Sequence, residues 1–179
     1  MTRSGLAKTC LVLALLAGGI GTAAHSALAA DSAGQFLEKL AGEFRGRGTA
    51  SLPGRDTPEK VSCKISNSYD AATKALVVKG NCASTQAKTT VSGKMVYDGD
   101  KVSGSLFTSG ESIVTKSSGS VKGEKLTVST NFSDKVSGKL TRTLQVIRST
   151  SRGFDADFFI YNSSNGKFER AGSIKFTGS

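Results

Sequence analysis

Residues 63–82 are CKISNSYDAATKALVVKGNC, a stretch that predicts a β-hairpin closed by a disulfide. Polar and apolar residues alternate on both sides of a polar centre, as they do in strands that bury one face. If Cys63 lies opposite Cys82, the turn falls at residues 71–74, directly after Asp70, a residue type that favours turn initiation. The facing pairs are then Ile65 with Gly80, Asn67 with Val78, and Tyr69 with Leu76. The third cysteine, Cys10, lies in a predicted export leader, and the two that remain after its removal most simply form this one disulfide.

The period-two alternation continues on both sides of this hairpin, from residue 43 to the end of the chain. An Asp-Gly pair at 98–99 and an Asn-Gly pair at 165–166 are strong hairpin signals. Helical periodicity occurs once, over residues 32–41, where the apolar stripe is Phe36, Leu37 and Leu40. We expect strands near residues 43–52, 60–69, 74–82, 86–97, 101–108, 111–121, 124–132, 138–148, 153–162 and 167–176.

Antiparallel strands in this number must protect their edges, and closing the sheet protects all of them. We therefore predict an all-β fold, an antiparallel up-and-down β-barrel of about eight to ten strands with a short N-terminal helix. A flattened sandwich is the alternative. An outer-membrane barrel shares the alternation, but it needs aromatic girdles and commonly ends in an aromatic residue. This chain has no Trp, only 3 Tyr, and ends at Ser179.

Residues 1–29 have the three parts of a secretory signal peptide. The start is positively charged, residues 10–20 form an apolar run that is too short for a membrane span, and Ala27-Leu28-Ala29 is a cleavage site. Cleavage would leave residues 30–179, a length that suits a single β-barrel domain. The short leader, rich in Ala and Leu, favours a bacterial source. We expect a periplasmic or secreted protein.

The charge is strongly positive, at +10 for the whole chain, and stays positive without the leader. The lysines occur singly rather than in clusters, which is typical of a solvated face that keeps a sheet soluble. The other interpretation is a preference for an anionic envelope component, such as phospholipid headgroups or lipopolysaccharide. With no arginine stripe and no aromatic platform motif, we expect no nucleic-acid partner.

The single histidine, His25, lies within the leader, so the exported chain would contain no imidazole. This excludes Ser-His-Asp and Cys-His catalysis, His-ligated haem and most zinc sites. Cys63 and Cys82 form no C-x-x-C motif, and no nucleophile elbow, Walker loop or EF-hand loop occurs. Asp155 and Asp157 share one polar strand face, which is typical of exposed surface. We expect a protein that is not an enzyme and that has neither a metal nor a cofactor.

Residues 40–48, LAGEFRGRG, pass from the helix into the first strand through a Gly-x-aromatic sequence. This start resembles that of calycin-type barrels, the lipocalins, fatty-acid-binding proteins and nitrobindin-like proteins. Phe44 stands where these families usually carry Trp, and Arg170 resembles the basic residue that in lipocalins packs against that aromatic ring. The resemblance implies a ligand-binding barrel. Nitrobindin-like barrels bind haem through a histidine near the C-terminus, which is lacking here, so the resemblance does not extend to haem.

Two arginines fall in phase with apolar residues, Arg142 with Leu144 and Arg170 with Ile174. An arginine on an apolar strand face must find a partner or reach water. One interpretation directs both arginines into the lumen, where they hold the carboxylate or phosphate of an amphipathic ligand. The other places Arg170 over Phe44 at one barrel end, with Arg142 at the rim or brought into another phase by a bulge.

These observations predict an exported barrel that binds a hydrophobic or amphipathic, anionic small molecule in its lumen, with Arg142, Arg170 and Phe44 as site residues. Glycines in inward phase either leave room for a cavity or let the barrel close tightly; they are Gly46, Gly48, Gly80, Gly93 and Gly104. The alternative is a cell-envelope interaction or inhibitor protein that acts through its loops and basic surface.

Overall fold

The computed structural model describes residues 32–51, 57–85, 87–109, 112–135 and 138–179. The predicted leader, residues 1–29 with His25, lies outside the described residues. The elements are α2 (Ser32–Lys39), β1 (Gly42–Ala50), β2 (Glu59–Asp70), β3 (Ala75–Ala83), β4 (Lys88–Asp98), β5 (Lys101–Ser109), β6 (Ser112–Lys122), β7 (Lys125–Asp134), β8 (Leu140–Thr150), β9 (Gly153–Asn162) and β10 (Lys167–Gly178). Each strand overlaps its predicted range, and no end differs by more than two residues.

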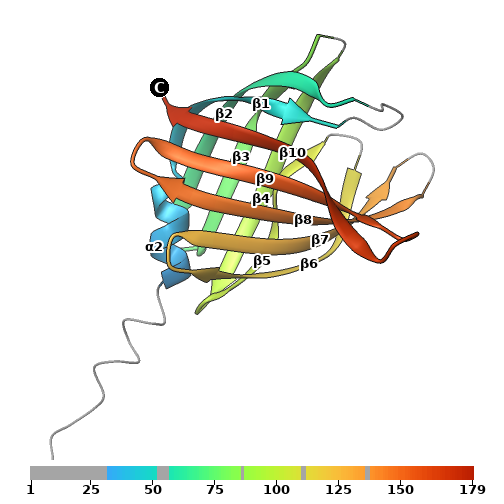
Figure 1. Cartoon of the computed structure of the whole chain (residues 1–179). Coiled ribbons are helices and arrows are strands. Elements are labelled where there is room, and N and C mark those ends of the chain that lie inside the picture. Colours follow the sequence, from blue (N-terminus) through green and yellow to red (C-terminus); the bar gives the residue numbers. More distant parts are fainter. Residues whose placement is uncertain (1–31, 52–56, 86, 110–111, 136–137) are drawn as a thin grey trace, which may run out of the picture.

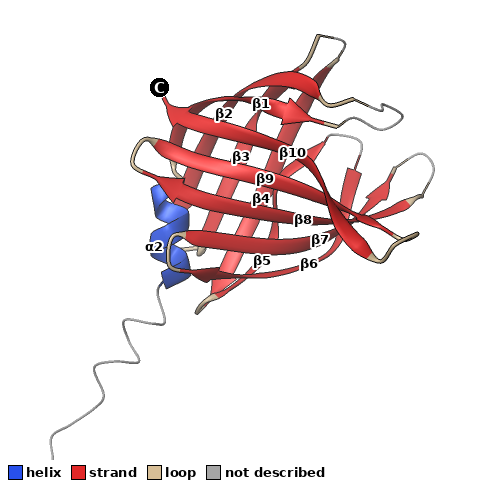
Figure 2. Ribbon diagram, viewed as in Figure 1, coloured by secondary structure: helices blue, strands red, loops and turns tan. Residues whose placement is uncertain are grey.

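The ten strands form a closed antiparallel barrel in which each strand pairs with its neighbours in the chain, and β10 pairs with β1 (Figure 1). The predicted up-and-down barrel is therefore confirmed, and the sandwich alternative is wrong. The helix α2 lies at one end of the barrel (Figure 2). The β9–β10 connection, together with the end of β7 and the start of β8, lies at the opposite end, which we call the mouth.

The β2–β3 hairpin has the predicted register and is closed by the Cys63–Cys82 disulfide. Ile65 faces Gly80, Asn67 faces Val78 and Tyr69 faces Leu76, as predicted. In the turn, Asp70 Oδ1 accepts a hydrogen bond from the backbone N–H of Ala72 over 2.9 Å, and its Oδ2 accepts one from the Thr73 hydroxyl over 2.8 Å. The aspartate therefore organises the turn through its side chain, as this residue type does in Asx turns.

The helix α2 closes the barrel at the end opposite the mouth, because its apolar stripe faces inward. Phe36, Leu37 and Leu40 are all buried, as their helical spacing predicts. Asn67 of β2 donates a hydrogen bond from its side chain to the carbonyl of Leu40 over 2.7 Å, which ties the end of the helix to the barrel wall. Among the described residues, no helix has the length and apolar character needed to span a bilayer.

Aromatic rings fill the barrel between the helix and the middle of the lumen. The ring of Phe154 lies 5.1 Å from that of Phe44 and stacks 4.7 Å from Phe176. Phe176 in turn stacks on Phe107 at 5.5 Å, and Phe107 meets Phe158 edge to face at the same distance. These rings form a continuous packed column through the core, in the offset and edge-to-face arrangements that aromatic pairs prefer.

The inward glycines of β1 allow β1 and β10 to pack closely. A side chain at Gly46 would collide with the ring of Phe176, and one at Gly48 would collide with the backbone of Ser173 on β10. Of the two interpretations of these glycines, the structure therefore supports tight closure of the barrel for this pair of strands.

Candidate functional site

Arg142 lies on the outer face of the barrel. On β8 the buried, inward side chains are Gln145 and Ile147, so the opposite phase, which contains Arg142, faces outward. The guanidinium carbon of Arg142 lies 5.3 Å from the ring centroid of Tyr161 on β9 and 5.2 Å from that of Phe168 on β10. The interpretation that directs Arg142 into the lumen is wrong, because the apolar phase of β8 is its outer one.

Arg170 also lies outside, and the reason is a bulge. The register of β9 and β10 shifts between Arg170 and Gly172, so residues before the bulge have the opposite phase to Ile174 and Phe176. The side chain of Arg170 is 59% exposed and donates a hydrogen bond to Oδ1 of Asp157 on β9. The expectation that Arg170 faces the lumen is therefore wrong, because the alternation does not continue through β10.

Phe44 belongs to the core at the helix end of the barrel. It is buried, packs on Phe154 and lies opposite Gly178 near the end of β10. Arg170 lies at the other end of β10, towards the mouth, and is paired with Asp157. The lipocalin-like contact between the basic residue and the aromatic ring, which the resemblance implies, is thus not made by Arg170 and Phe44.

Arg142 and Arg170 come together at the mouth, where both line a groove of about 650 Å³. We call it the mouth groove; its walls also contain Leu140, Ile160 and Tyr161. Leu140 is 71% exposed and Ile160 is 41% exposed, so two large aliphatic side chains of the groove are accessible to a ligand. The groove therefore combines exposed apolar surface with two guanidinium groups.

The carboxylates near the mouth groove are engaged by neighbouring side chains. Glu169 accepts hydrogen bonds from the side-chain amides of Asn165 at 2.8 Å and Asn162 at 2.9 Å, and these bonds hold its pKa below the ordinary value. Asp157 is 13% exposed; burial raises its pKa, but hydrogen bonds from Arg170, Ser173 and Arg148 outweigh that effect and lower it. Arg142 makes no ion pair with a described residue.

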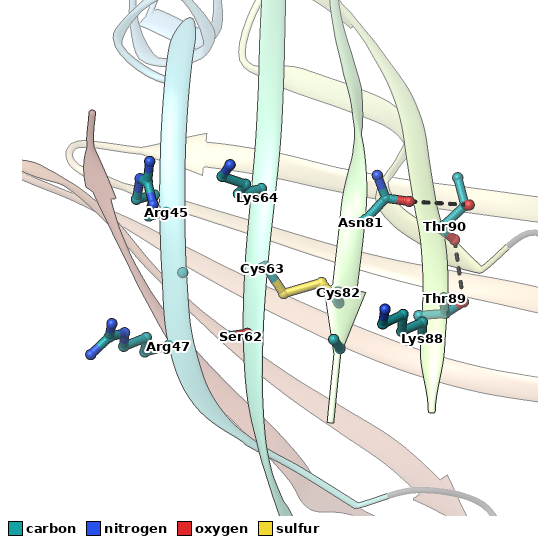
Figure 3. A pocket seen from close by; sticks show the side chains of 12 residues that line it. Arg45, Arg47, Ser62, Cys63, Lys64, Asn81, Cys82, Lys88, Thr89 and Thr90 are labelled. Atoms are coloured by element: carbon teal, nitrogen blue, oxygen red, sulfur yellow. Dashed lines mark hydrogen bonds between the residues drawn. A yellow bond between two sulfur atoms is a disulfide. The ribbon is translucent and has the colours of Figure 1, made fainter. Parts of the chain in front are cut away.

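A second groove, of about 580 Å³, lies on the outer face of β1 to β4, next to the disulfide (Figure 3). We call it the basic groove, and four exposed cations line it: Arg45, Arg47, Lys64 and Lys88. None of the twelve residues that line it is acidic. On the inside of the same strands, Phe44 and Cys63 are buried, so the alternation directs these cations away from the lumen.

The basic groove was missed because the lysines and arginines are single residues in the sequence. Pairing of the strands brings them together: Arg45 lies directly opposite Lys64, and Arg47 lies directly opposite Lys175. One signal in the sequence could have identified part of the basic groove. The sequence of residues 44–48, FRGRG, places Arg45 and Arg47 on one face of a strand whose other face is apolar or glycine.

The lumen contains a few polar groups but no cluster of metal ligands. Among the described residues, no group of three or more His, Cys, Asp or Glu side chains could hold a metal ion. Gln145 donates a hydrogen bond to Ser105 Oγ over 3.1 Å, while its own Oε1 and the hydroxyl oxygen of Thr130 are buried without a partner. These atoms are neutral hydrogen-bonding groups, suited to an uncharged donor.

The comparisons with known proteins support the barrel fold and identify no family. No protein-family profile matches the chain, and no curated protein sequence matches it. The crystal structure of Rv2717c from M. tuberculosis is similar, with a TM-score of 0.62 and 13% sequence identity over 82% of this chain and 97% of that chain. The likeness shows a shared fold. Membership of the lipocalin or nitrobindin-like proteins stays a prediction.

Proposed function

We propose that this chain is an exported, non-enzymatic binding protein that holds an amphipathic anion in its mouth groove. The observation that carries the proposal is the exposure of Leu140 and Ile160 in a groove that also contains Arg142 and Arg170. Exposed aliphatic side chains beside cations fit a molecule with an apolar chain and an anionic head. Export is supported by the leader and by the disulfide, because disulfides persist in oxidising compartments.

Arg142 is the better anchor for the anionic head. Its guanidinium carbon lies near the rings of Tyr161 and Phe168, and the group has no hydrogen bond to a described residue. A cation–π contact does not use up hydrogen-bond donors, so the N–H groups of Arg142 remain available to a carboxylate or phosphate. Arg170 already shares Asp157 with Arg148, so it contributes less charge.

The apolar chain gains its binding energy from contact with Leu140 and Ile160. Burial contributes about 0.8 kcal/mol for each methylene group removed from water. The packed aromatic column limits how deep a chain can enter, so the ligand lies at the mouth rather than through the length of the lumen. The proposed site therefore lies at the mouth of the barrel, whereas the sequence predicts a site inside the lumen.

Isothermal titration calorimetry with dodecyl phosphate, kept below its micelle concentration, tests this proposal. We expect saturable binding, at least ten-fold weaker binding in Arg142→Gln, and unchanged binding in Arg152→Gln, which removes an equal charge from an exposed turn at the other end of the barrel. Leu140→Ser should also weaken binding. No binding to the unmodified protein, or equal affinities in the two arginine variants, would overturn the proposal.

A further inference from the structure

The basic groove is a cationic surface with no acidic residue in its lining. Arg45 faces Lys64 across the β1–β2 pair, and Arg47 faces Lys175 across the β1–β10 pair. Like charges directly opposite one another destabilise a sheet. The fold carries both pairs without an ion pair to any carboxylate in the described part of the chain.

Three other cations on the described barrel have carboxylate partners. Lys39 pairs with Glu124 at 2.7 Å, and Arg148 and Arg170 share Asp157. None of the residues that line the basic groove is acidic, so no lining residue neutralises its four cations. Lys175, which faces Arg47, lies directly opposite Asp155 on β9, so the charge that lacks a neighbouring carboxylate is that of the groove itself.

Neutral hydrogen-bonding groups complete the basic groove. Figure 3 shows Asn81 and Thr90 beside the cations, with the Thr90 hydroxyl 3.3 Å from Asn81 Oδ1. Because Thr90 occupies the oxygen of this amide, the amide N–H donors of Asn81 remain to bind an oxyanion. Ser62 adds a hydroxyl on the neighbouring strand. Charged and neutral donors around one groove suit the oxygens of a phosphate ester.

We propose that the basic groove docks this protein on a membrane surface by binding the phosphate groups of anionic lipid headgroups. The cationic face continues beyond the groove, since Lys60 and Lys79 are exposed in the same outward phase of β2 and β3. An extended cationic face matches an array of phosphates better than it matches one small anion. Clustered basic residues are attracted to the negative surface of anionic bilayers. This inference does not depend on the mouth groove.

Co-sedimentation with lipid vesicles tests the inference. The purified protein should bind vesicles of equal parts phosphatidylglycerol and phosphatidylcholine, should not bind phosphatidylcholine alone, and should dissociate when salt is raised from 0.1 to 0.5 M. The groove variant carries Arg45→Gln, Arg47→Gln, Lys64→Gln and Lys88→Gln. Its vesicle binding should fall on the order of 1,000-fold, from the loss of four surface cations.

A control variant of equal charge separates the groove from net charge. It carries four substitutions of exposed lysines on β5, β6 and β7: Lys101→Gln, Lys116→Gln, Lys122→Gln and Lys125→Gln. We expect it to retain vesicle binding within about three-fold, because these lysines lie outside the proposed groove. Equal losses in both variants would show that only net charge matters and would overturn the inference. So would groove-variant binding equal to that of the unmodified protein.

Two further measurements serve as controls for folding and for binding at the mouth groove. Circular dichroism and thermal unfolding of both variants report whether the barrel is intact. Both variants should be at least as stable as the unmodified protein, because each loses opposed like charges. Dodecyl phosphate binding should be unchanged in the groove variant, so that failure at one groove is distinguishable from failure at the other. Displacement of the protein from vesicles by millimolar inorganic phosphate would identify a small-anion site and would overturn the membrane assignment.

Discussion

Arg170 donates a hydrogen bond to Oδ1 of Asp157 on the outer face of the barrel, and Arg148 donates one to Oδ2 of the same carboxylate. Asp157 thus joins β8 to β10 through its position on β9 between them. The β10 bulge after Arg170 makes this possible, because it puts Arg170 on the outside while Ile174 stays in the core. A single carboxylate therefore fixes two arginines at the side of the barrel.

This arrangement predicts a pH-dependent contribution of Asp157 to stability. Its pKa is lowered in the folded state, so the stabilisation is present above its unfolded pKa, about 3.9, and is lost as the pH falls through the folded value. Asp157→Asn should lower the free energy of unfolding by about 1 kcal/mol at pH 7, a modest amount because both arginines are half-exposed. Urea unfolding from pH 7 to pH 2.5 should show the two proteins converging in acid. A difference that stays constant with pH would contradict this account.

The Cys63–Cys82 bridge should be a major source of stability. The cysteines are 19 residues apart, and closing a loop of this size restricts the unfolded chain by an amount equivalent to about 3 kcal/mol. Cys63→Ala combined with Cys82→Ala should lose about that much free energy of unfolding in urea. The unmodified protein should lose a similar amount on reduction with dithiothreitol, and the double variant should not respond to the reductant. Equal stability of the oxidised protein and the double variant would show that the disulfide does not stabilise the fold.

Gly48 should be essential to the closure between β1 and β10. Any Cβ at this position would lie inside van der Waals contact with the carbonyl of Ser173. Gly48→Ala should therefore lower the free energy of unfolding by about 2 kcal/mol, as overpacking does. Thr49→Ala, one residue along on the exposed face, is the matched control and should change it by less than about 0.5 kcal/mol. Similar losses in the two variants would argue against the steric explanation.

The fold was predictable because its main signals are local. Alternation marks strands and turn residues mark hairpins, so every strand was found, and the paired cysteines fixed the β2–β3 register. Closure of the sheet into a barrel was predictable from the number of strands, because unpaired edge strands promote aggregation. Each of these inferences depends on residues near one another in the sequence.

The candidate site was less predictable, because the assumption that the apolar phase faces inward fails on β8. There the inner phase contains Thr143 and Gln145, while the outer phase contains Leu144 and Arg142. The outer apolar residues lie opposite aromatic residues of β9, such as Phe159, whose position only the strand register reveals. Sequence alternation identifies the two faces of a strand, but it does not say which of them is inside when both are partly apolar.

The proposal of an amphipathic anion in the mouth groove is tested most directly by a fluorophore placed there. The chain contains no Trp, so Leu140→Trp would put the only indole in the mouth groove, and Val96→Trp would put one on the exposed face of β4 as a control. We predict that dodecyl phosphate shifts the emission of the Leu140→Trp protein to shorter wavelength in a saturable way and leaves that of Val96→Trp unchanged. No shift in the first protein, or the same shift in both, would contradict binding at the mouth.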